Sequence, residues 1–312
     1  MIFDSESVFE ENVITVLKQH GWKDGVLRYP TERDLLDNWK GILYRNNNDI
    51  DRLGKYPLTD GEMTQIIEQI ETLRTPLALN SFVNGRTVSI TRDNKEDVAH
   101  FGKEVSLYIY DRKEIAGGKS TYQIAQQPVY PAKNKMLNSR RGDLVLLING
   151  MPLIHIELKK SGIPVSQATN QIEKYAHEGV FTGLFRLVQI FVAMNPDDAV
   201  YFANPGVDKF NPSYYFHWAD YNNEPICGGQ NPGKDEWKLF IGGTSGTAGL
   251  LSIPMAHQLI GFYTIADSAD GCLKVLRSYQ YIAANAISDV VRKCDWEQRP
   301  SMPGRPDRKS VV

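Results

Sequence analysis

The centre of the chain, Arg140-Arg-Gly-Asp-Leu-Val-Leu-Leu-Ile-Asn-Gly-Met-Pro-Leu-Ile-His-Ile-Glu-Leu-Lys-Lys160, predicts a β-hairpin. An apolar run over residues 144–148 is followed by Asn149-Gly150, the strongest two-residue signal for a hairpin turn, and then by a second apolar run. Glu157 and Lys159 are two residues apart in the second strand, so their side chains leave one face roughly 6.6 Å apart. The Ile and Leu side chains that alternate with them are expected to pack into the core on the other face.

The pairing of the two strands decides whether Asp143 joins the face of Glu157. A strict two-residue loop pairs Asp143 with Ile156 and leaves Glu157 on the wrong side. We therefore predict one extra residue, either a loop over 149–151 or a bulge near Pro152, which would place Asp143 opposite Glu157. Proline cannot donate to a strand ladder, which favours an irregularity at that point.

Two acids and one amine brought together in this way suit metal-assisted cleavage of a phosphodiester bond. Mg²⁺ prefers oxygen ligands and keeps several waters, and it lowers the pKa of a bound water while stabilising charge on the phosphate. We expect Asp143 and Glu157 to bind Mg²⁺ and Lys159 to position or activate the attacking water, with the three side chains meeting at an edge of the sheet. His155, on the same face as Glu157, is interpreted as a hydrogen-bonded structural histidine rather than as a metal neighbour.

A helix is predicted after the hairpin, from about residue 164 to 178, with Ser166 as its N-cap and Gly179 just past its end. Gln171 and Tyr175 are four residues apart in this helix and therefore share a face. Taken alone, a Glu-x-Lys segment on a strand is more often a solvated ion pair. The upstream acid, the hairpin and this helix together favour the catalytic interpretation.

The order of these residues resembles a known nuclease family. Asp143, then Glu157-Leu-Lys159, then Gln171-Ile-Glu-Lys-Tyr175 resemble the PD-(D/E)xK nuclease core with the Gln-xxx-Tyr motif of RecB-like nucleases. The sequence over 141–160, with Asn170-Gln-Ile172 and Tyr201-Phe-Ala-Asn204, is similar to the N-terminal part of the R (motor) subunit of type I restriction enzymes. The similarity covers most of the first 205 residues, with glycine rather than proline before the first acid.

The resemblance implies a restriction-endonuclease-like α/β core, in which a mixed central sheet is flanked by helices. It implies a Mg²⁺-dependent endonuclease that cuts double-stranded DNA after ATP-driven translocation by motor domains absent from this chain. It also implies a complex with methyltransferase and specificity subunits, and a role for Gln171 and Tyr175 in holding the active-site helix and the DNA backbone near the site. The first helix of the family often carries a glutamate that approaches the metal, and Glu10 is the candidate here.

The first helix is predicted to open at Asp4-Ser-Glu-Ser7, with Ser7 and Glu10 as a capping box and Gly21 at its end. Glu6 lies one turn from Glu10 on the same side of this helix, and we interpret it as compensation of the helix dipole.

Basic residues gather just before the first acid of the motif. Lys133, Lys135, Arg140 and Arg141 belong to the most basic local segment, which is either an ordinary solvated loop or a phosphate contact beside the site. Two further candidates for DNA contact are Lys160 and Lys174, although exposed lysines are usually only solvated.

The composition is that of a soluble globular protein, with a formal net charge of −2 at pH 7. Such a molecule has no overall attraction for DNA, so contact must come from a local patch, a partner subunit or another part of the protein. Three widely spaced cysteines, Cys227, Cys272 and Cys294, argue against a disulfide framework or a zinc knuckle. With neither a membrane-spanning apolar run nor a signal peptide visible, we expect a cytoplasmic protein.

Strands interleaved with helices predict an α/β sandwich around a mixed sheet. The expected helices are 31–44, 63–73 and 255–262, and the expected strands are 87–91, 104–110, 187–194 and 199–203, with a strand or loop at 122–128. We divide the chain into a nuclease domain at 1–205, a loop-rich connector at 206–270, and the start of a superfamily 2 helicase-like motor domain at 271–312. Trp218 and Trp237 are expected to anchor the connector, whose order is left open.

A further helix is predicted from about residue 276 to 294, and its start, Arg277-Ser-Tyr-Gln280, is similar to the adenine-reading Q motif of superfamily 2 helicases. There Gln280 would contact ATP in the full-length protein, because an amide offers both a donor and an acceptor. No Gly-xxxx-Gly-Lys-Ser/Thr phosphate loop occurs in the sequence, so we expect a fragment without ATPase activity.

Two alternatives remain open from the sequence. One is a repair or recombination nuclease of the RecB-like group, which would cut DNA without methyltransferase or specificity subunits. The other is a non-catalytic DNA-binding or subunit-docking module, in which the Glu-Leu-Lys segment is only a surface ion pair.

Overall fold

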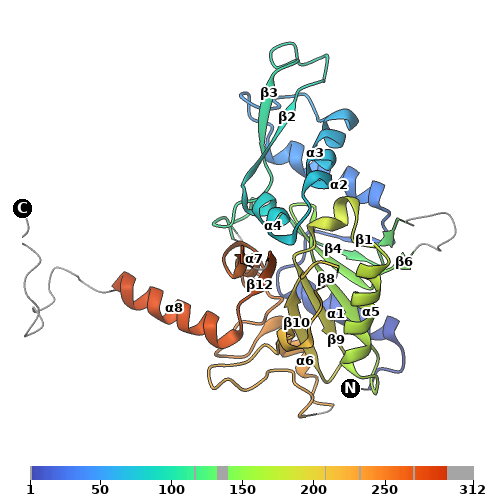
Figure 1. The fold of residues 1–312 in the computed structure, drawn as a ribbon, viewed down its shortest axis with the longest axis vertical. Coiled ribbons are helices and arrows are strands. Elements are labelled where there is room, and N and C mark those ends of the chain that lie inside the picture. Colours follow the sequence, from blue (N-terminus) through green and yellow to red (C-terminus); the bar gives the residue numbers. More distant parts are fainter. Residues whose placement is uncertain are drawn as a thin grey trace, which may run out of the picture.

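The centre of the protein, in its computed structural model, is a six-stranded sheet in the order β1-β4-β7-β8-β9-β10 (Figure 1). The structure describes residues 2–115, 117–131, 140–207, 209–231, 233–269 and 271–293. The strands are β1 (Val26–Arg28), β4 (Tyr122–Gln126), β7 (Leu144–Ile148), β8 (Met151–Leu158), β9 (Ile190–Met194) and β10 (Ala199–Ala203). β1 pairs with β4 and β8 pairs with β9 in parallel, whereas the other neighbours are antiparallel. The expected α/β fold with a mixed sheet is therefore confirmed.

The sheet is covered on both faces, because every residue of β7, β8, β9 and β10 is buried. Helix α5 (Val165–His177) lies along the sheet, and its Ile172 joins Phe191 of β9 in one apolar cluster (Figure 1). Helix α1 (Glu6–Gln19) contacts β8 and belongs to a second, larger cluster that contains Ile154. Because β7 and β8 are the third and fourth of six strands, the expectation that the site lies at a sheet edge is wrong. Central strands are buried on both faces and need a helix on each side. Helix α1 comes before these strands in the sequence and α5 comes after them.

The remaining elements before residue 205 are α2 (Glu32–Asn46), α3 (Asp60–Thr72), α4 (Pro76–Asn84), the hairpin β2 (Thr87–Thr91) with β3 (Glu104–Tyr108), the short pair β5 (Val129–Tyr130) with β6 (Arg140–Arg141), and a 3₁₀ helix, Gly183–Leu187. The predicted helices near 31–44 and 63–73 and the predicted strands are confirmed within a few residues. Helix α4 was not expected from the sequence, although Thr75 caps its N-terminus and proline occupies its first turn.

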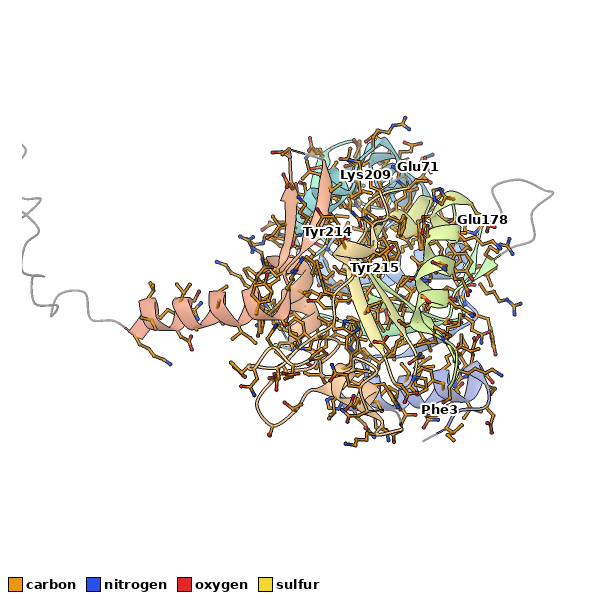
Figure 2. All side chains as sticks on the ribbon, turned by 60° about the horizontal axis from the view of Figure 1, so that its bottom comes forward. Phe3, Glu71, Glu178, Lys209, Tyr214 and Tyr215 are labelled. Carbon is orange, nitrogen blue, oxygen red and sulfur yellow. The ribbon has the colours of Figure 1, made fainter. Side chains whose placement is uncertain are left out.

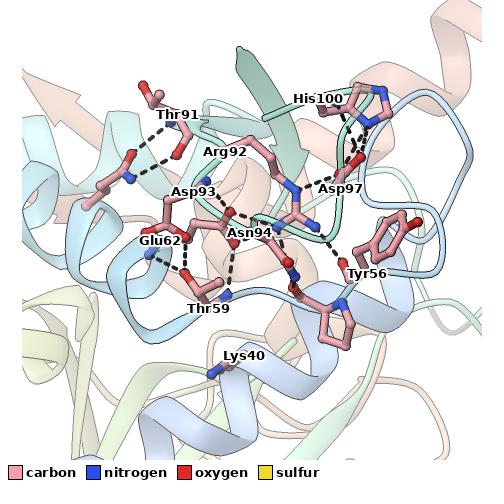
Figure 3. A network of polar contacts seen from close by, with 12 residues as sticks. Lys40, Tyr56, Thr59, Glu62, Thr91, Arg92, Asp93, Asn94, Asp97 and His100 are labelled. Atoms are coloured by element: carbon pink, nitrogen blue, oxygen red, sulfur yellow. Dashed lines mark hydrogen bonds and ion pairs between the residues drawn. The ribbon is translucent and has the colours of Figure 1, made fainter. Parts of the chain in front are cut away.

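A buried ion network fixes the β2–β3 hairpin to the start of α3 (Figure 3). Arg92 Nη1 lies 2.6 Å from Glu62 Oε2, and its Nε lies 3.0 Å from Asp97 Oδ2, with all three side chains buried. Glu62 also receives the backbone N–H of Thr59 and completes a capping box there. Removing one partner of a buried pair typically costs about 3–5 kcal/mol, so this hairpin is held firmly to the body.

The chain after residue 205 packs onto the same core. It contains α6 (Glu236–Gly242), α7 (Met255–Phe262), β11 (Thr264–Asp267) with β12 (Cys272–Val275), and α8 (Ser278–Lys293). Trp218 and Trp237 are fully buried, as expected of anchors, and Trp237 packs edge-on against Phe3 and Phe9. Helix α8 extends away from the body and buries only Ser278 (Figure 1).

Two predicted helix caps are wrong. Helix α1 is capped by Ser5, whose side chain accepts the N–H of Val8, whereas Glu10 turns into the interior instead of closing a capping box with Ser7. Helix α5 begins directly after Pro164, so Ser166 lies inside its first turn and no side chain caps it. Gly21 and Gly179, in contrast, follow their helices with positive φ as expected.

Within the described residues, no helix combines the length and the apolar character that a membrane crossing requires.

Candidate functional site

The hairpin between β7 and β8 has the extra residue that the sequence predicted. Asn149 and Gly150 both have positive φ, at 52° and 83°, which is the two-residue type I′ turn. Leu147 pairs with Pro152 but Leu146 pairs with Ile154, so a bulge follows the proline. The register then continues to Leu144 opposite Ile156, and one step further it places Asp143 beside Glu157. The bulge, rather than a longer loop, brings the two acids together.

The two carboxylates meet where β7 begins and β8 ends, with Glu157 buried and Asp143 partly buried. Asp143 Oδ2 accepts the backbone N–H of Leu158 at 2.6 Å. Glu157 is fully buried, and neither of its carboxylate oxygens has a hydrogen-bond partner among the described residues. Burial, and then the charge of Glu157, holds the pKa of Asp143 well above its usual range. Burial raises the pKa of Glu157 to about 8, opposed in part by Lys159.

These features fit a divalent cation. Two adjacent carboxylates, one buried and one partly buried, disfavour joint ionisation without a compensating charge, and the unpartnered oxygens of Glu157 are potential ligands. Among the described residues there is no group of three or more His, Cys, Asp or Glu side chains arranged around one metal position. The protein therefore offers two carboxylates rather than a full cage, which suits Mg²⁺ because that ion retains several waters.

Lys159 lies beside the acids at the end of β8. Its Nζ is 3.8 Å from Glu157 Oε1 and 3.4 Å from Glu6 Oε1, and it donates to the Leu158 carbonyl at 3.0 Å. Its side chain is 9% exposed, so the amine is close to the surface but held by these neighbours. The predicted common face of Glu157 and Lys159 is confirmed, and their roles stay predictions.

Helix α1 contributes two further acids from one side. Glu10 is 3% exposed and accepts hydrogen bonds from Gln126 Nε2 at 2.5 Å and Gln127 Nε2 at 3.3 Å. Burial raises its pKa, and its charge in turn raises the pKa of Asp143. Glu6, which we interpreted only as dipole compensation, forms the ion pair with Lys159. The four-residue spacing of Glu6 and Glu10, which places them on one side of α1, was the sequence signal that both could reach the site.

Gln171 and Tyr175 of α5 form the expected pair. Gln171 Nε2 donates to the Tyr175 hydroxyl at 2.7 Å, and that hydroxyl donates to the Arg141 carbonyl at 2.8 Å. The pair thus ties α5 to the segment that leads into Asp143. Burial raises the pKa of Tyr175, which keeps its hydroxyl protonated as a donor. The same pair borders a shallow groove of about 360 Å³, whose lining residues are Arg140, Gln167, Asn170, Gln171, Lys174 and Tyr175.

His155 is the hydrogen-bonded histidine that the sequence indicated. Its Nδ1 lies 2.8 Å from the Tyr130 hydroxyl, and its Nε2 lies 3.3 Å from Glu157 Oε2. Burial lowers its pKa to about 4, so the ring is neutral near pH 7. Tyr130 was not identified from the sequence, because it lies in a separate strand pair far from the motif.

The predicted DNA-contacting cations have different surroundings. Arg140 forms a two-bond ion pair with Glu178, at 2.8 Å for each bond. Glu178 lies just past the end of α5 (Figure 2). Arg141, Lys160 and Lys174 are exposed. Lys133 and Lys135 lie outside the described residues.

Gln280 is not brought to the acids. It is exposed at the start of α8, where its Oε1 accepts the N–H of Arg277 at 2.9 Å. It lines a different pocket of about 380 Å³, between β10, β12 and α8, in which Tyr214 and Tyr215 also take part (Figure 2).

Comparison with known proteins places these residues in a family context. The family model described as "Type I restriction enzyme R protein N terminus" matches residues 4–210. The chain is 29% identical over 295 residues to the type I restriction enzyme SsaAORF53P endonuclease subunit of Staphylococcus saprophyticus, covering 92% of this chain and 27% of that protein. It is also 29% identical over 289 residues to the SauMSSORF170P endonuclease subunit of Staphylococcus aureus, with the same two coverages.

A relative from Escherichia coli is matched over most of its length. The type I restriction enzyme EcoprrI endonuclease subunit is 28% identical over 296 residues, covering 91% of this chain and 82% of that protein. In contrast, the chain spans about a quarter of the length of the staphylococcal relatives, 27% in each case.

Proposed function

The chain belongs to the family of type I restriction enzyme R protein N-terminal regions, and from this premise we propose that it is a Mg²⁺-dependent endonuclease domain that cleaves double-stranded DNA. The observation that carries the proposal is the convergence of Asp143 and Glu157 across the β7–β8 bulge, with Lys159 Nζ 3.8 Å from Glu157. A buried acid with two unpartnered oxygens, set against a partly buried second acid and one amine, has no evident structural purpose, because burying such a group costs folding free energy.

Asp143 and Glu157 would hold Mg²⁺. When bound, the ion supplies a water of lowered pKa and stabilises negative charge on the scissile phosphate. Lys159 is placed to hold that water or a phosphate oxygen through its ammonium protons, since its Nζ faces the acids at the end of β8. Glu6 keeps the ammonium in position through their contact at 3.4 Å. The Asp143 carboxylate is fixed by the Leu158 N–H, so its orientation does not depend on the ion.

The surrounding residues would orient the DNA. Gln171 and Tyr175 hold α5 against the Arg141 carbonyl, which fixes the wall of the groove beside the acids. Lys174 lines this groove, and together with the exposed Arg141 and Lys160 it would contact phosphates and release counterions. Glu10, buried beside Gln126, would act as a further acid that approaches the metal.

The activity of the longer relatives is also proposed for the protein to which this chain corresponds. Motor domains would drive ATP-dependent translocation, Gln280 would contact adenine there, and methyltransferase and specificity subunits would supply recognition of the DNA site. This chain alone would then cleave DNA poorly or without specificity.

The test is Mg²⁺-dependent nicking of supercoiled plasmid by the purified chain. Variants D143N, E157Q and K159M should each abolish nicking, while E104Q, which changes an exposed acid on β3, serves as a matched control that should not. Retained nicking in any of the first three, with unchanged thermal unfolding, would contradict the assignment.

The two alternatives predict other results. A RecB-like repair nuclease would prefer ends or branches and would gain nothing from added methyltransferase and specificity subunits. A docking module would show neither nicking nor binding of a divalent metal linked to Asp143.

A further inference from the structure

We propose that His155, held by Tyr130, is a positioning residue that orients the Glu157 carboxylate toward the metal. This inference rests on the proposed nuclease function and adds to it a polar series, Tyr130–His155–Glu157, that the motif itself does not contain. Tyr130 and His155 are joined by a hydrogen bond, whereas His155 Nε2 and Glu157 Oε2 face each other as two buried atoms without a hydrogen-bond partner among the described residues. Tyr130 comes from β5, and His155 and Glu157 come from β8. The Tyr130 hydroxyl lies 2.8 Å from His155 Nδ1, and His155 Nε2 lies 3.3 Å from Glu157 Oε2.

The two neighbours of the imidazole ring determine which nitrogen carries the proton. An ionised carboxylate accepts hydrogen bonds but cannot donate them. His155 Nε2, the nitrogen that faces Glu157, must therefore carry the hydrogen of the neutral ring. His155 Nδ1 then accepts from Tyr130, whose hydroxyl is the remaining donor of the series. Tyr130 is 1% exposed, so solvent does not compete for this bond.

The ring cannot easily turn away from this arrangement. Phe181 and Phe191 meet it edge-on, with ring centroids at 5.5 and 6.0 Å, and Tyr175 lies at 6.3 Å. His155 itself is fully buried. A fixed ring can therefore guide the Glu157 carboxylate, because His155 Nε2 and Glu157 Oε2 lie 3.3 Å apart and a small rotation of the carboxylate would join these two unpartnered atoms.

Gly142 makes room for this pair. A Cβ atom on residue 142 would lie 2.5 Å from the Tyr130 hydroxyl and 2.9 Å from His155 Cε1, distances that atoms do not adopt without displacement. The glycine before Asp143, where the motif usually has proline, is thus explained by the space that the Tyr130–His155 pair occupies. Residues 142 and 143 thus have two roles: Asp143 is the first acid, and Gly142 leaves space for the Tyr130–His155 pair beside the second acid, Glu157.

His155 acts on the metal through Glu157 rather than as a ligand. With its hydrogen on Nε2 the ring would donate to the carboxylate 3.3 Å away, and a ring nitrogen that carries a hydrogen cannot donate a lone pair to an ion. The described residues also contain no group of three or more acid, histidine or cysteine side chains around one metal position. Groups that hydrogen-bond a metal ligand fix its orientation, and their loss typically lowers metal affinity or activity about 10- to 100-fold.

The experiment measures Mn²⁺ affinity by titration calorimetry and plasmid nicking for the 312-residue chain and four variants. H155L removes the hydrogen bond to Tyr130 and the polar contact with Glu157. H155N can reproduce Nδ1 but not Nε2, whereas H155Q can reach Glu157 with its amide nitrogen. Y130F removes the hydroxyl that holds the ring. We expect H155L and H155N to bind Mn²⁺ about 10- to 100-fold more weakly, Y130F to lie between them and the wild type, and H155Q to recover most of the affinity.

A second buried tyrosine–histidine pair provides the matched control. The Tyr122 hydroxyl lies 2.9 Å from His257 Nδ1, and Tyr122 pairs with Ile148 at the end of β7 opposite to Asp143, so Y122F removes the same kind of bond away from the acids. Y122F should lower thermal stability as Y130F does while leaving Mn²⁺ affinity unchanged. This comparison separates loss of packing from loss of orientation.

Wild-type affinity in H155L, or failure of H155Q to exceed H155L when both are folded, would overturn the positioning role and leave the nuclease assignment standing. A wild-type chain that binds no Mn²⁺ and nicks no plasmid would instead overturn the proposed function, and the inference with it.

Discussion

Replacing Glu157 by glutamine should flatten the pH dependence of stability of the metal-free protein. Glutamine keeps the shape of the side chain but cannot ionise. The folded-state pKa of Glu157 is raised by burial to about 8, against an ordinary value of 4.5 in the unfolded chain. A carboxyl whose pKa is raised on folding binds more protons in the folded state, so it contributes most stability at low pH and loses it as the pH rises.

The magnitude follows from the size of this shift. Between about pH 4.5 and 8 the folded protein retains a proton that the unfolded chain releases, which lowers the free energy of unfolding by about 1.4 kcal/mol per pH unit. Over the whole window the loss sums to about 5 kcal/mol for this one group. Asp143, whose pKa is also raised, adds a decrease of the same sign.

The assay is urea unfolding in EDTA at intervals between pH 5 and 9, for the wild type and E157Q. We expect a steep fall in the wild type and a clearly smaller one in E157Q. Added Mg²⁺ should counteract the fall in the wild type alone, because the ion binds the ionised pair and stabilises the folded state by mass action. Parallel curves for the two proteins would refute the reasoning, since they would show that Glu157 is not buried in an unfavourable environment.

Other predictions concern the neighbours of the two acids. K159M should abolish nicking but retain Mn²⁺ binding in calorimetry, and loss of both would place Lys159 among the groups that assemble the metal site. G142A should destabilise the protein by about 1–3 kcal/mol in urea unfolding, because its methyl group collides with Tyr130 and His155, and a neutral result would deny the tight contact. Y175F should lower nicking severalfold with little change in Mn²⁺ affinity, because it frees α5 from the Arg141 carbonyl; weakened Mn²⁺ binding would show a direct influence on the acids.

Local patterns were sufficient for the part of the site that lies within one hairpin. Asn149-Gly150 fixed the turn, and the need to bring Asp143 opposite Glu157 required the extra residue that appears after Pro152. The pairing of Gln171 with Tyr175 followed from helical spacing alone. These features depend on contacts between residues that are close in sequence, so the local sequence pattern was sufficient to predict them.

Contacts between distant segments were harder to predict. Tyr130 and Gln126 reach the site because β4 and β5 pass next to the hairpin, and nothing in their own sequence indicates it. Glu6 was assigned to the helix dipole because its partner, Lys159, lies more than a hundred residues away. The sheet-edge expectation failed for a related reason, since the position of a strand within a sheet depends on pairing with β4 and β9.

The C-terminal third illustrates the limits of composition. The sequence predicted a loop-rich connector over residues 206–270 with one helix at 255–262, yet α6 also forms there after Asp235 adopts a left-handed conformation, with φ 56°. Its Trp237 is buried against Phe3 and Phe9, so tertiary packing supplies the stability that the local sequence lacks.

The most direct test is a crystal of this chain soaked in Mn²⁺ and examined for anomalous density. The account predicts one peak between the carboxylates of Asp143 and Glu157, within ligand distance of both, that disappears in E157Q. Density elsewhere, or none at this position in crystals whose protein still nicks plasmid in Mn²⁺, would contradict it.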